Sequence, residues 1–502
     1  MKLITRLTMF FLILLFSIGN LQAKKKKQYF DQIEFEIDFK ITHPILTANF
    51  VNNANQEILL IGETDEKQKV IALYIFDETL NNYSQHSLIS LPKEAIAFDL
   101  FTNASGIASI LLLDSSGISK LDLEKKRFQL LSKINSLYLE DKPQFVAKKE
   151  LVKDLNGDGL DDIIVSDFSN IHLLLQQQNG EFVKTSLPIK ASIDMTSERV
   201  SFSEARIFNV DSNFDQLVDI IVVERGQLQI YQQSKDGNFS PINNRISLPM
   251  QVSALPWWTV KGADGESADQ SDLEHRMLEN IEDINGDGII DIMVRHTKSS
   301  GVLDRQNQYE IHYGINQGGT LSFSQEANTL ISAEGTLSGL ELLDINADGR
   351  KEILVSSFDI GVSQIIGALL SGSIDQDVYV FSLDEQDKYH KEPLFSEEVD
   401  LNFSLSSGST GQPVILMADL NGDGFKELVL SAGKKRLAIY KGENNQQLFE
   451  SRNKRHQLTL PQDGSMLTVV DLNNDNQQEI IVRYGKQDEK KLRNKVVVLS
   501  AK

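Results

Sequence analysis

The stretch that decides the fold is "DINGDGIIDIMV", residues 283–294. Its first, third and fifth residues carry side-chain oxygens, a glycine stands sixth, and a ninth-position carboxylate opens an apolar run. A glycine among short polar residues favours a tight loop, and a short apolar run after it is typical of a buried strand. The stretch therefore predicts an acidic turn that leads into a core strand.

This pattern, called the acidic motif below, recurs along the chain. Complete copies start at Asp154, Asp211, Asp283, Asp344, Asp419 and Asp471, with successive starts 52 to 75 residues apart. Two weaker relatives, residues 49–60 and 99–113, precede them and lack most of the acidic side chains. A fixed motif at such spacing indicates repeated structural units, here eight.

Each unit contains four short apolar segments separated by polar turns, and helical periodicity is nearly absent. Four short strands per repeat of about 60 residues are the signature of a β-propeller blade. We expect an all-β fold, an eight-bladed β-propeller in a single domain over residues 24–502. Seven blades with one outlying unit, or two smaller arrays, remain alternatives.

The chain ends predict how the ring closes. After Asp471 only two strand-like segments remain, so the last unit lacks a fourth strand, whereas residues 32–41 form a spare strand before the first unit. Open sheet edges pair with other chains and are usually covered. We expect residues 32–41 to pair with residues 495–501 and complete the last blade.

The acidic motif has the chemistry of a divalent-cation site. Positions 1, 3 and 5 are Asp, Asn and Asp in every complete copy, and position 9 is Asp or Glu. With the carbonyl of position 7 these groups offer hard oxygen ligands, which suit Ca²⁺ better than Mg²⁺. We therefore expect about six Ca²⁺ sites. The candidate ligands are Asp154, Asn156, Asp158, Leu160, Asp162, Asp211, Asn213, Asp215, Leu217, Asp219, Asp283, Asn285, Asp287, Ile289, Asp291, Asp344, Asn346, Asp348, Arg350, Glu352, Asp419, Asn421, Asp423, Phe425, Glu427, Asp471, Asn473, Asp475, Gln477 and Glu479.

An EF-hand or a plain hairpin turn fits the motif less well than a calcium-binding propeller loop. An EF-hand needs Glu at position 12 and a following helix, but position 12 is Val or Leu and a strand follows. A plain Asn/Asp-rich hairpin turn would account for one copy but not for six at blade spacing. Position 6 is Gly in four copies, Asn476 in another and Gln216 in the copy at Asp211, where a left-handed backbone would be strained. We expect weaker binding there and metal-free turns in the two weaker relatives.

The first 23 residues have the features of a secretory signal. Lys2 and Arg6 precede an apolar stretch that ends near Ile18, and Ala23 is a small residue suited to cleavage. An uncleaved anchor is the alternative, since lysines at 24–27 follow the stretch. No later segment has the unbroken apolar length of a membrane span. We expect export to the periplasm or the exterior of a Gram-negative cell.

Composition excludes several classes of protein. The net charge is −21, which argues against nucleic acid as a partner because its phosphates require a basic surface. The chain has no cysteine, so disulfides, thiolate catalysis and thiolate metal sites are absent. We expect a monomer.

The motif and its spacing resemble the FG-GAP/VCBS-type repeats of calcium-binding propellers, including the propeller of integrin α chains. The resemblance is strong in the six complete units and weak in the first two, and clear Phe-Gly and Gly-Ala-Pro flanks are missing. It implies a calcium-bearing propeller at or outside the cell surface. Members include binding proteins and sugar-active enzymes, so the fold alone does not decide the function.

A ligand site is expected on the face opposite the acidic motifs. Insertions at residues 251–280, 297–308 and 357–376 should gather there, between blades or between second and third strands. The candidate ligand-binding residues are Trp257, Trp258, His275, Arg276, Arg295, His296 and Arg305. Aromatic rings with Arg and His suit a protein or glycan ligand, and in particular an acidic one. The alternative is that the tryptophans only pack the insertion down.

The sequence leaves two functions open. The first is an exported, calcium-binding propeller that acts as a ligand-binding or scaffold module. The second is a propeller enzyme, a lyase or hydrolase, that acts on acidic polysaccharides through His275 or His296 with an arginine. Recognisable nucleophile, zinc-protease and phosphate-loop motifs are missing from the sequence, so we name no catalytic residues.

Overall fold

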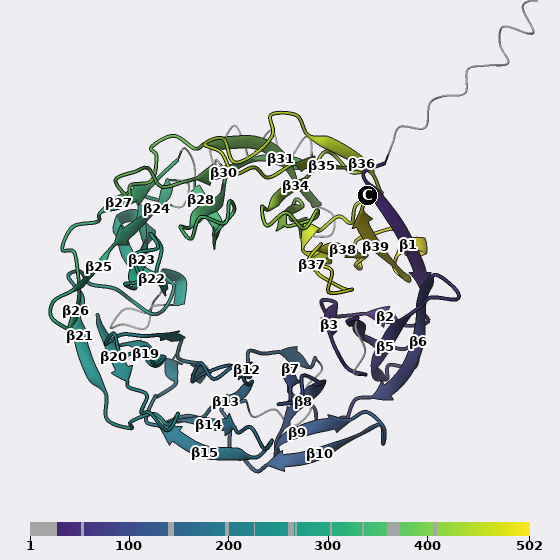
Figure 1. The fold of residues 1–502 in the computed structure, drawn as a ribbon, viewed down its shortest axis with the longest axis horizontal. Helices are drawn as coiled ribbons and strands as arrows, with labels where there is room; N and C mark the ends of the chain where they lie inside the picture. The colour runs from purple at the N-terminus through teal and green to yellow at the C-terminus, as the bar shows by residue number, and fades with distance from the viewer. Residues whose placement is uncertain are drawn as a thin grey trace, which may run out of the picture.

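The computed structural model describes residues 28–51, 55–138, 145–195, 200–224, 226–259, 266, 269–301, 304–333, 336–358, 372–404 and 409–502. Eight sheets of four or five strands stand in a ring around a common centre (Figure 1). The fold is therefore an all-β, eight-bladed β-propeller. Eight blades are confirmed, and the seven-blade alternative is wrong.

The first four blades follow one another in chain order. Blade one contains β2 (Lys40–Ile41), β3 (Leu46–Ala48), β4 (Glu57–Glu63), β5 (Lys69–Asp77) and β6 (Asn82–Ser90). Blade two contains β7 (Ala97–Thr102), β8 (Ala108–Asp114), β9 (Gly117–Asp122), β10 (Arg127–Ser132) and β11 (Ala147–Lys148). Blade three contains β12 (Val152–Lys153), β13 (Asp162–Ser166), β14 (Ile171–Gln176) and β15 (Phe182–Leu187). Blade four contains β18 (Ile207–Val210), β19 (Asp219–Glu224), β20 (Gln227–Tyr231) and β21 (Asn244–Ser247).

The remaining blades continue the order. Blade five contains β22 (Leu273–Glu282), β23 (Asp291–Ser299), β24 (Arg305–His312) and β27 (Thr329–Ile331). Blade six contains β28 (Thr336–Leu343), β29 (Glu352–Phe358), β30 (Ser373–Phe381), β31 (Phe395–Ser404) and β32 (Ser409–Gly411). Blade seven contains β33 (Ile415–Ala418), β34 (Glu427–Ser431), β35 (Arg436–Tyr440) and β36 (Lys454–Gln457). Blade eight contains β37 (Leu467–Val470), β38 (Glu479–Arg483), β39 (Lys495–Ala501) and, as its outer strand, β1 (Phe30–Glu36).

Few elements lie outside the blades. They are the hairpins β16 (Ser192–Met195) with β17 (Val200–Ser203) and β25 (Gly314–Asn316) with β26 (Leu321–Phe323), and the 3₁₀ turns η1 (Trp257–Thr259), η2 (Gln270–Asp272), η3 (Gly464–Met466) and η4 (Lys490–Leu492). None of the described helices is long and apolar enough to cross a membrane.

The ring closes between the two ends of the chain. β1 pairs antiparallel with β39, from Phe30 opposite Ala501 to Glu36 opposite Lys495. The expected closure is confirmed, but its bounds were wrong. Residues 40–41 belong to blade one, where β2 pairs with β4, because the chain turns into that blade after Glu36.

The core is divided among the blade interfaces. Eight clusters of buried apolar side chains each join the facing sheets of two neighbouring blades. Val496 and Val498 of β39, for example, pack with Ile58 and Leu60 of blade one. Because strand side chains alternate between faces, each inner strand contributes to two clusters and must be apolar on both sides. This explains the continuous apolar runs after each acidic motif.

Two of the expected insertions have different bounds. β22 begins at Leu273, so the link from blade four to blade five ends there and not at residue 280. Residues 297–308 consist mostly of the paired ends of β23 and β24, because the two strands are longer than the sequence indicated. In the third insertion, residues 359–371 lie outside the described residues.

Candidate functional site

All six complete acidic motifs connect the first and second strands of their blades. In blade five the motif begins after β22 ends at Glu282 and its ninth residue, Asp291, opens β23. The same arrangement holds in blades three, four, six, seven and eight, so the motif loops lie on one face of the ring. The prediction that each motif leads into a core strand is confirmed.

The carboxylates of positions 1 and 5 order the loop backbone. In blade five, Asp283 Oδ2 accepts from Gly288 N at 2.8 Å, and Asp287 Oδ1 accepts from Ile289 N at 2.8 Å. The equivalent two bonds occur in the other five loops. Asn285 at position 3 donates from Nδ2 to Asp287 Oδ2 at 3.2 Å. The side chains of positions 1, 3 and 5 therefore gather within one exposed turn.

The turn requires a left-handed backbone at two positions, not one. In blade five these are Gly286 (φ 78°) and Gly288 (φ 82°), positions 4 and 6. In blade four they are Phe214 (φ 66°) and Gln216 (φ 67°), which confirms the strain expected at Gln216. The need at position 4 was missed, although Gly or Asn stands there in four of the six copies.

The ninth residue has a structural role of its own. Asp291 is fully buried; its Oδ2 accepts from Ile284 N at 2.9 Å and its Oδ1 from Gly314 N at 2.9 Å. The bond from position 2 recurs in all six loops, at 2.8 to 3.3 Å. Burial raises the pKa of Asp291 to about 7, with smaller contributions from Asp287 and Asp283. Each such carboxylate joins the start of its motif loop to the body of the blade.

The first weaker unit retains only this ninth-position carboxylate. Glu57 is buried, and its Oε2 accepts from Phe50 N at 2.6 Å, as in the complete copies. In the second weaker unit, Asn103 closes a short turn by bonding Ile107 N at 3.0 Å. The first weaker unit thus lacks the acidic side chains of positions 1 and 5 but keeps the buried carboxylate of position 9. Position 9 therefore serves the fold even where the proposed cation ligands are missing.

The motif loops fit a hard divalent cation by the chemistry of their donors. Each loop gathers two carboxylates and an amide, and the carbonyl of position 7, which is predicted as a further ligand, would complete an all-oxygen set. Arg350 at position 7 does not obstruct its loop, because its guanidinium bonds Asp387 Oδ1 and Asp384 O, both at 2.6 Å. If the ninth carboxylates also act as ligands, as predicted, each would bind the cation while one of its oxygens accepts the backbone N–H of position 2.

On the opposite face, blade five carries a hollow of about 320 Å³. Its lining residues are Trp257, Trp258, Arg295, Thr297, Arg305 and Asn307. β23 runs nine residues from the motif loop at Asp291 to Ser299, so the β23–β24 turn lies about 30 Å away on the far face. We call this hollow the Trp–Arg hollow. Thr297 and Asn307 were not identified from the sequence.

Of the two arginines that line the hollow, one is paired with a described carboxylate and the other is not. Arg295 lies 5.7 Å from the Trp258 ring, and its Nε is 2.9 Å from Glu279 Oε1. Arg305 lies 5.5 Å from the Trp257 ring and forms no ion pair with any described carboxylate. Trp258 is 52% exposed. The hollow therefore offers an exposed indole beside one uncompensated positive charge.

The segment that carries the tryptophans lies along the innermost strand of blade five. Ser253 N donates to Arg276 O at 2.8 Å, and Leu278 N donates to Ser253 O at 3.1 Å. His275 Nε2 lies 2.9 Å from Leu255 O and fixes the segment farther along. His275 thus holds the tryptophan segment in place and does not line the hollow.

Arg276 and His296 face away from the hollow. Arg276 on β22 stands directly opposite His296 on β23. His296 follows Arg295 in the strand, and successive strand residues point to opposite faces, so Arg276 and His296 lie on the face toward blade four. His296 is 2% exposed, with Nδ1 2.7 Å from Glu310 Oε1 and Nε2 2.9 Å from Glu274 Oε1. Of the seven candidate ligand residues, the structure gathers Trp257, Trp258, Arg295 and Arg305. The other three do not line it, because His275 and Arg276 stand on strand β22 and His296 lies on the other face of β23.

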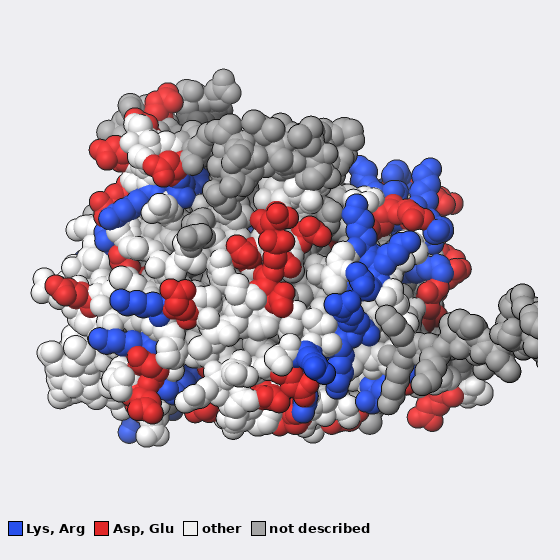
Figure 2. All heavy atoms as spheres, turned by 90° about the horizontal axis from the view of Figure 1, so that it is seen from above, with Lys and Arg blue, Asp and Glu red and all other residues white. Residues whose placement is uncertain are grey.

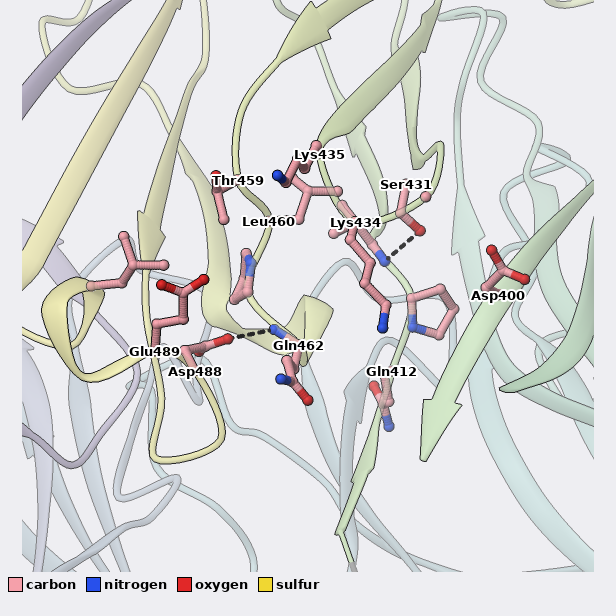
Figure 3. Close-up of a pocket in the computed structure, with 15 residues that line it drawn as sticks. Asp400, Gln412, Ser431, Lys434, Lys435, Thr459, Leu460, Gln462, Asp488 and Glu489 are labelled. Carbon is pink, nitrogen blue, oxygen red and sulfur yellow. Dashed lines mark hydrogen bonds between the residues drawn. The ribbon is translucent and has the colours of Figure 1, made fainter. Parts of the chain in front are cut away.

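Two further depressions were not anticipated. One, of about 200 Å³, lies between blades seven and eight, with a buried floor of Pro413, Val414, Leu460 and Pro461. Figure 3 shows the Lys434 side chain extending toward Gln412 and Gln462 at its rim. The other, of about 460 Å³, lies between blades one and two beside the motif-free loops. Both arise from residues distant in sequence, so no local pattern identifies them.

Comparison with known proteins identifies the repeat. Residues 283–355 and 419–482 match the FG-GAP-like repeat family. The resemblance inferred from the acidic motifs is confirmed in these two regions. No curated protein gives a significant match to the chain.

Solved structures give broad but weak similarity. A lectin of Agrocybe aegerita that recognises non-reducing terminal N-acetylglucosamine is 13% identical, with 94% of this chain and 96% of that chain covered and a TM-score of 0.38. Sqt1 of Saccharomyces cerevisiae is 7% identical over 95% and 100%, with a TM-score of 0.41. The V. cholerae biofilm matrix protein Bap1 is 13% identical over 91% and 76%, with a TM-score of 0.28.

Proposed function

We propose that this chain, an eight-bladed β-propeller with FG-GAP-like repeats, is an exported, calcium-stabilised module that binds a protein or glycan ligand through the Trp–Arg hollow. The carrying observation is that the exposed Trp258 indole lines the same hollow as the uncompensated Arg305, which lies over the Trp257 ring. An indole held in the open contributes little to the core of the protein. It offers a flat apolar surface, and the arginine adds charge and directional donors.

Calcium supports this function indirectly. The motif loops and the Trp–Arg hollow lie at opposite ends of the same strands, so the cation would stabilise the blade and not touch the ligand. Binding to the folded state alone raises the stability of that state. Export fits this role because calcium is abundant outside cells, where weak extracellular-type sites fill.

Catalysis on acidic polysaccharides is the alternative, and the geometry favours binding. His296 is buried and engaged by two carboxylates, and His275 is bonded to the tryptophan segment. Neither imidazole therefore faces the hollow as a free acid or base. New absorbance or reducing ends from uronic-acid polymers, lost on His275→Ala, would support the enzyme instead.

The binding proposal is tested with the calcium-loaded protein on glycan and envelope-protein panels. For any ligand found, the double variant Trp257→Ala, Trp258→Ala should weaken binding at least tenfold, since an aromatic anchor contributes about 2 kcal/mol or more. Phe168→Ala is the matched control, because Phe168 is an exposed aromatic residue on blade three. Equal binding by the double variant, with an unchanged melting temperature, would refute a ligand role for the hollow.

A further inference from the structure

Blade seven carries a cluster of positively charged side chains, although the chain as a whole is acidic. The protein has 71 acidic and 50 basic residues. On the outer part of this blade, exposed lysines and arginines nevertheless form a group that we call the basic ridge. It consists of Lys434, Lys435, Arg436, Arg452, Lys454 and Arg455.

The basic ridge is uncompensated. None of its six side chains forms an ion pair with a carboxylate in the described part of the chain. Arg436 lies on β35 and Arg455 on β36, the third and fourth strands of the blade, and Lys434 and Lys435 form the turn that rims the depression in Figure 3. Figure 2 shows lysine and arginine gathered in a column on the side where Figure 1 places β36. Like charges so arranged repel one another unless an anionic surface neutralises them.

The start of the described chain lies against this ridge. Gln28 Oε1 accepts from Gln457 N of β36 at 3.0 Å, and Lys454 Nζ is 5.5 Å from the centre of the Tyr29 ring. Residues 24–27, immediately before Gln28, are four lysines. They follow the expected cleavage point at Ala23, so they remain whether residues 1–23 are removed or retained. The described chain therefore enters the ring beside the basic ridge, shortly after the apolar stretch that ends near Ile18 in the sequence.

We propose that the basic ridge holds this face of the ring against an anionic lipid bilayer. Clusters of four to eight lysines and arginines beside a membrane segment bind acidic headgroups, and each cation near the surface contributes about 1 kcal/mol, a factor of about five in affinity. The chain reaches the ridge from a membrane-targeting sequence, which favours lipid as the occupant. The proposal does not depend on the Trp–Arg hollow, which lies on blade five.

A second copy of the chain is the competing occupant. An acidic strip on blade six lies beside the ridge, and Figure 2 shows acidic side chains near the centre of the view. The strip consists of Asp375, Asp377, Glu397, Glu398 and Asp400. In the strip, Asp375 stands directly opposite Asp400, and Asp377 opposite Glu398. Ridge and strip on two copies could attract each other, so the test must separate this outcome from lipid binding.

The experiment measures flotation of the full chain with vesicles of phosphatidylcholine alone and of phosphatidylcholine with phosphatidylglycerol. The ratio of the two affinities isolates the electrostatic contribution to membrane binding, because the apolar N-terminal stretch would insert into both kinds of vesicle. The ridge variant is Arg436→Gln, Arg452→Gln, Arg455→Gln. The control variant is Lys93→Gln, Arg127→Gln, Lys235→Gln, which removes equal charge from exposed sites on other blades.

We expect the wild type to prefer the anionic vesicles, less so as salt increases. The ridge variant should lose this preference by roughly a hundredfold, at about fivefold per cation, and the control variant by less than threefold. Equal binding of the wild type to both vesicles, or equal losses in ridge and control variants, would overturn the proposal. So would vesicle-independent self-association that Glu397→Gln, Glu398→Gln abolishes, because the ridge would then serve a second copy.

Discussion

Ile284 N donates to Oδ2 of Asp291 at 2.9 Å, which ties the second residue of the acidic motif to the ninth. The other oxygen of Asp291 accepts from Gly314 N, beyond the third strand of the blade. One side chain thus holds together the loop, the second strand and the end of the third. Among the described residues of blade five, Asp283 and Asp287 at positions 1 and 5 form hydrogen bonds only within their own loop, so the two sets of acids should respond differently to substitution.

Asp291→Ala should destabilise the protein whether or not calcium is present. It leaves two buried backbone N–H groups without their acceptor, a loss of about 3 kcal/mol in the free energy of unfolding. Asp287→Ala, four residues earlier, should lower stability only in calcium. Urea unfolding of both variants, with calcium and with chelator, measures the difference. Equal dependence on calcium in the two variants would contradict separate roles.

Gln216→Gly should stabilise blade four. Gln216 is exposed and held at φ 67°, a conformation that costs a residue with a Cβ about 1 kcal/mol more than glycine. The substitution should raise the free energy of unfolding by about that amount and tighten calcium binding at the Asp211 loop. The matched reversal is Gly288→Gln in blade five, at the equivalent position, which should destabilise. Thermal melts of both variants provide the comparison.

Removing divalent cations should lower the melting temperature. At a free calcium concentration one hundred times its Kd, each occupied loop adds about 2.7 kcal/mol to the stability of the folded state. Calorimetry in chelator, then with calcium restored and with magnesium substituted, measures the effect and its selectivity. An unchanged melting temperature in all three solutions would show that the acidic motifs are structural turns only.

Acid should weaken the contact between strands β22, β23 and β24 of blade five through Glu310. Burial opposes ionisation of this carboxyl, but hydrogen bonds from His296 and Arg276 outweigh it and lower the pKa from 4.5 to about 2. The stabilisation is therefore fully present above about pH 4.5 and is lost as the pH falls toward 2. Glu310→Gln should cost roughly 2 kcal/mol at pH 6 and less at pH 3. Urea midpoints at both pH values test this, with exposed Glu392→Gln as the control. A constant difference would contradict it.

The repeat made most of the architecture predictable. Blade number, motif placement and ring closure follow from one local pattern copied along the chain, because each blade contacts only its neighbours. The bounds of β1 were less accessible, since Ile37 and Phe39 are as apolar as the strand itself and pack into the next blade interface. Local sequence does not show where a chain leaves one sheet for another.

The two candidate sites also differ in how far the sequence alone predicted them. Loop chemistry could be predicted from spacing, because all its groups lie within nine residues. The residues that line the Trp–Arg hollow could not be predicted in this way, since Arg295 and His296 are neighbours that differ only in the side of β23 on which each lies. Thr297 and Asn307 join the hollow through the pairing of β23 with β24. Such pairings depend on the strand register, which the sequence left open.

The pairing of β1 with β39 also constrains the order in which the protein can mature. The outer strand of blade eight is made first and its partner last, some 460 residues later. Until the final strand has been synthesised, β1 lacks the partner strand with which it pairs, and the ring stays open. In the export that we propose for this chain, the ring would therefore stay open until the whole chain has crossed the membrane.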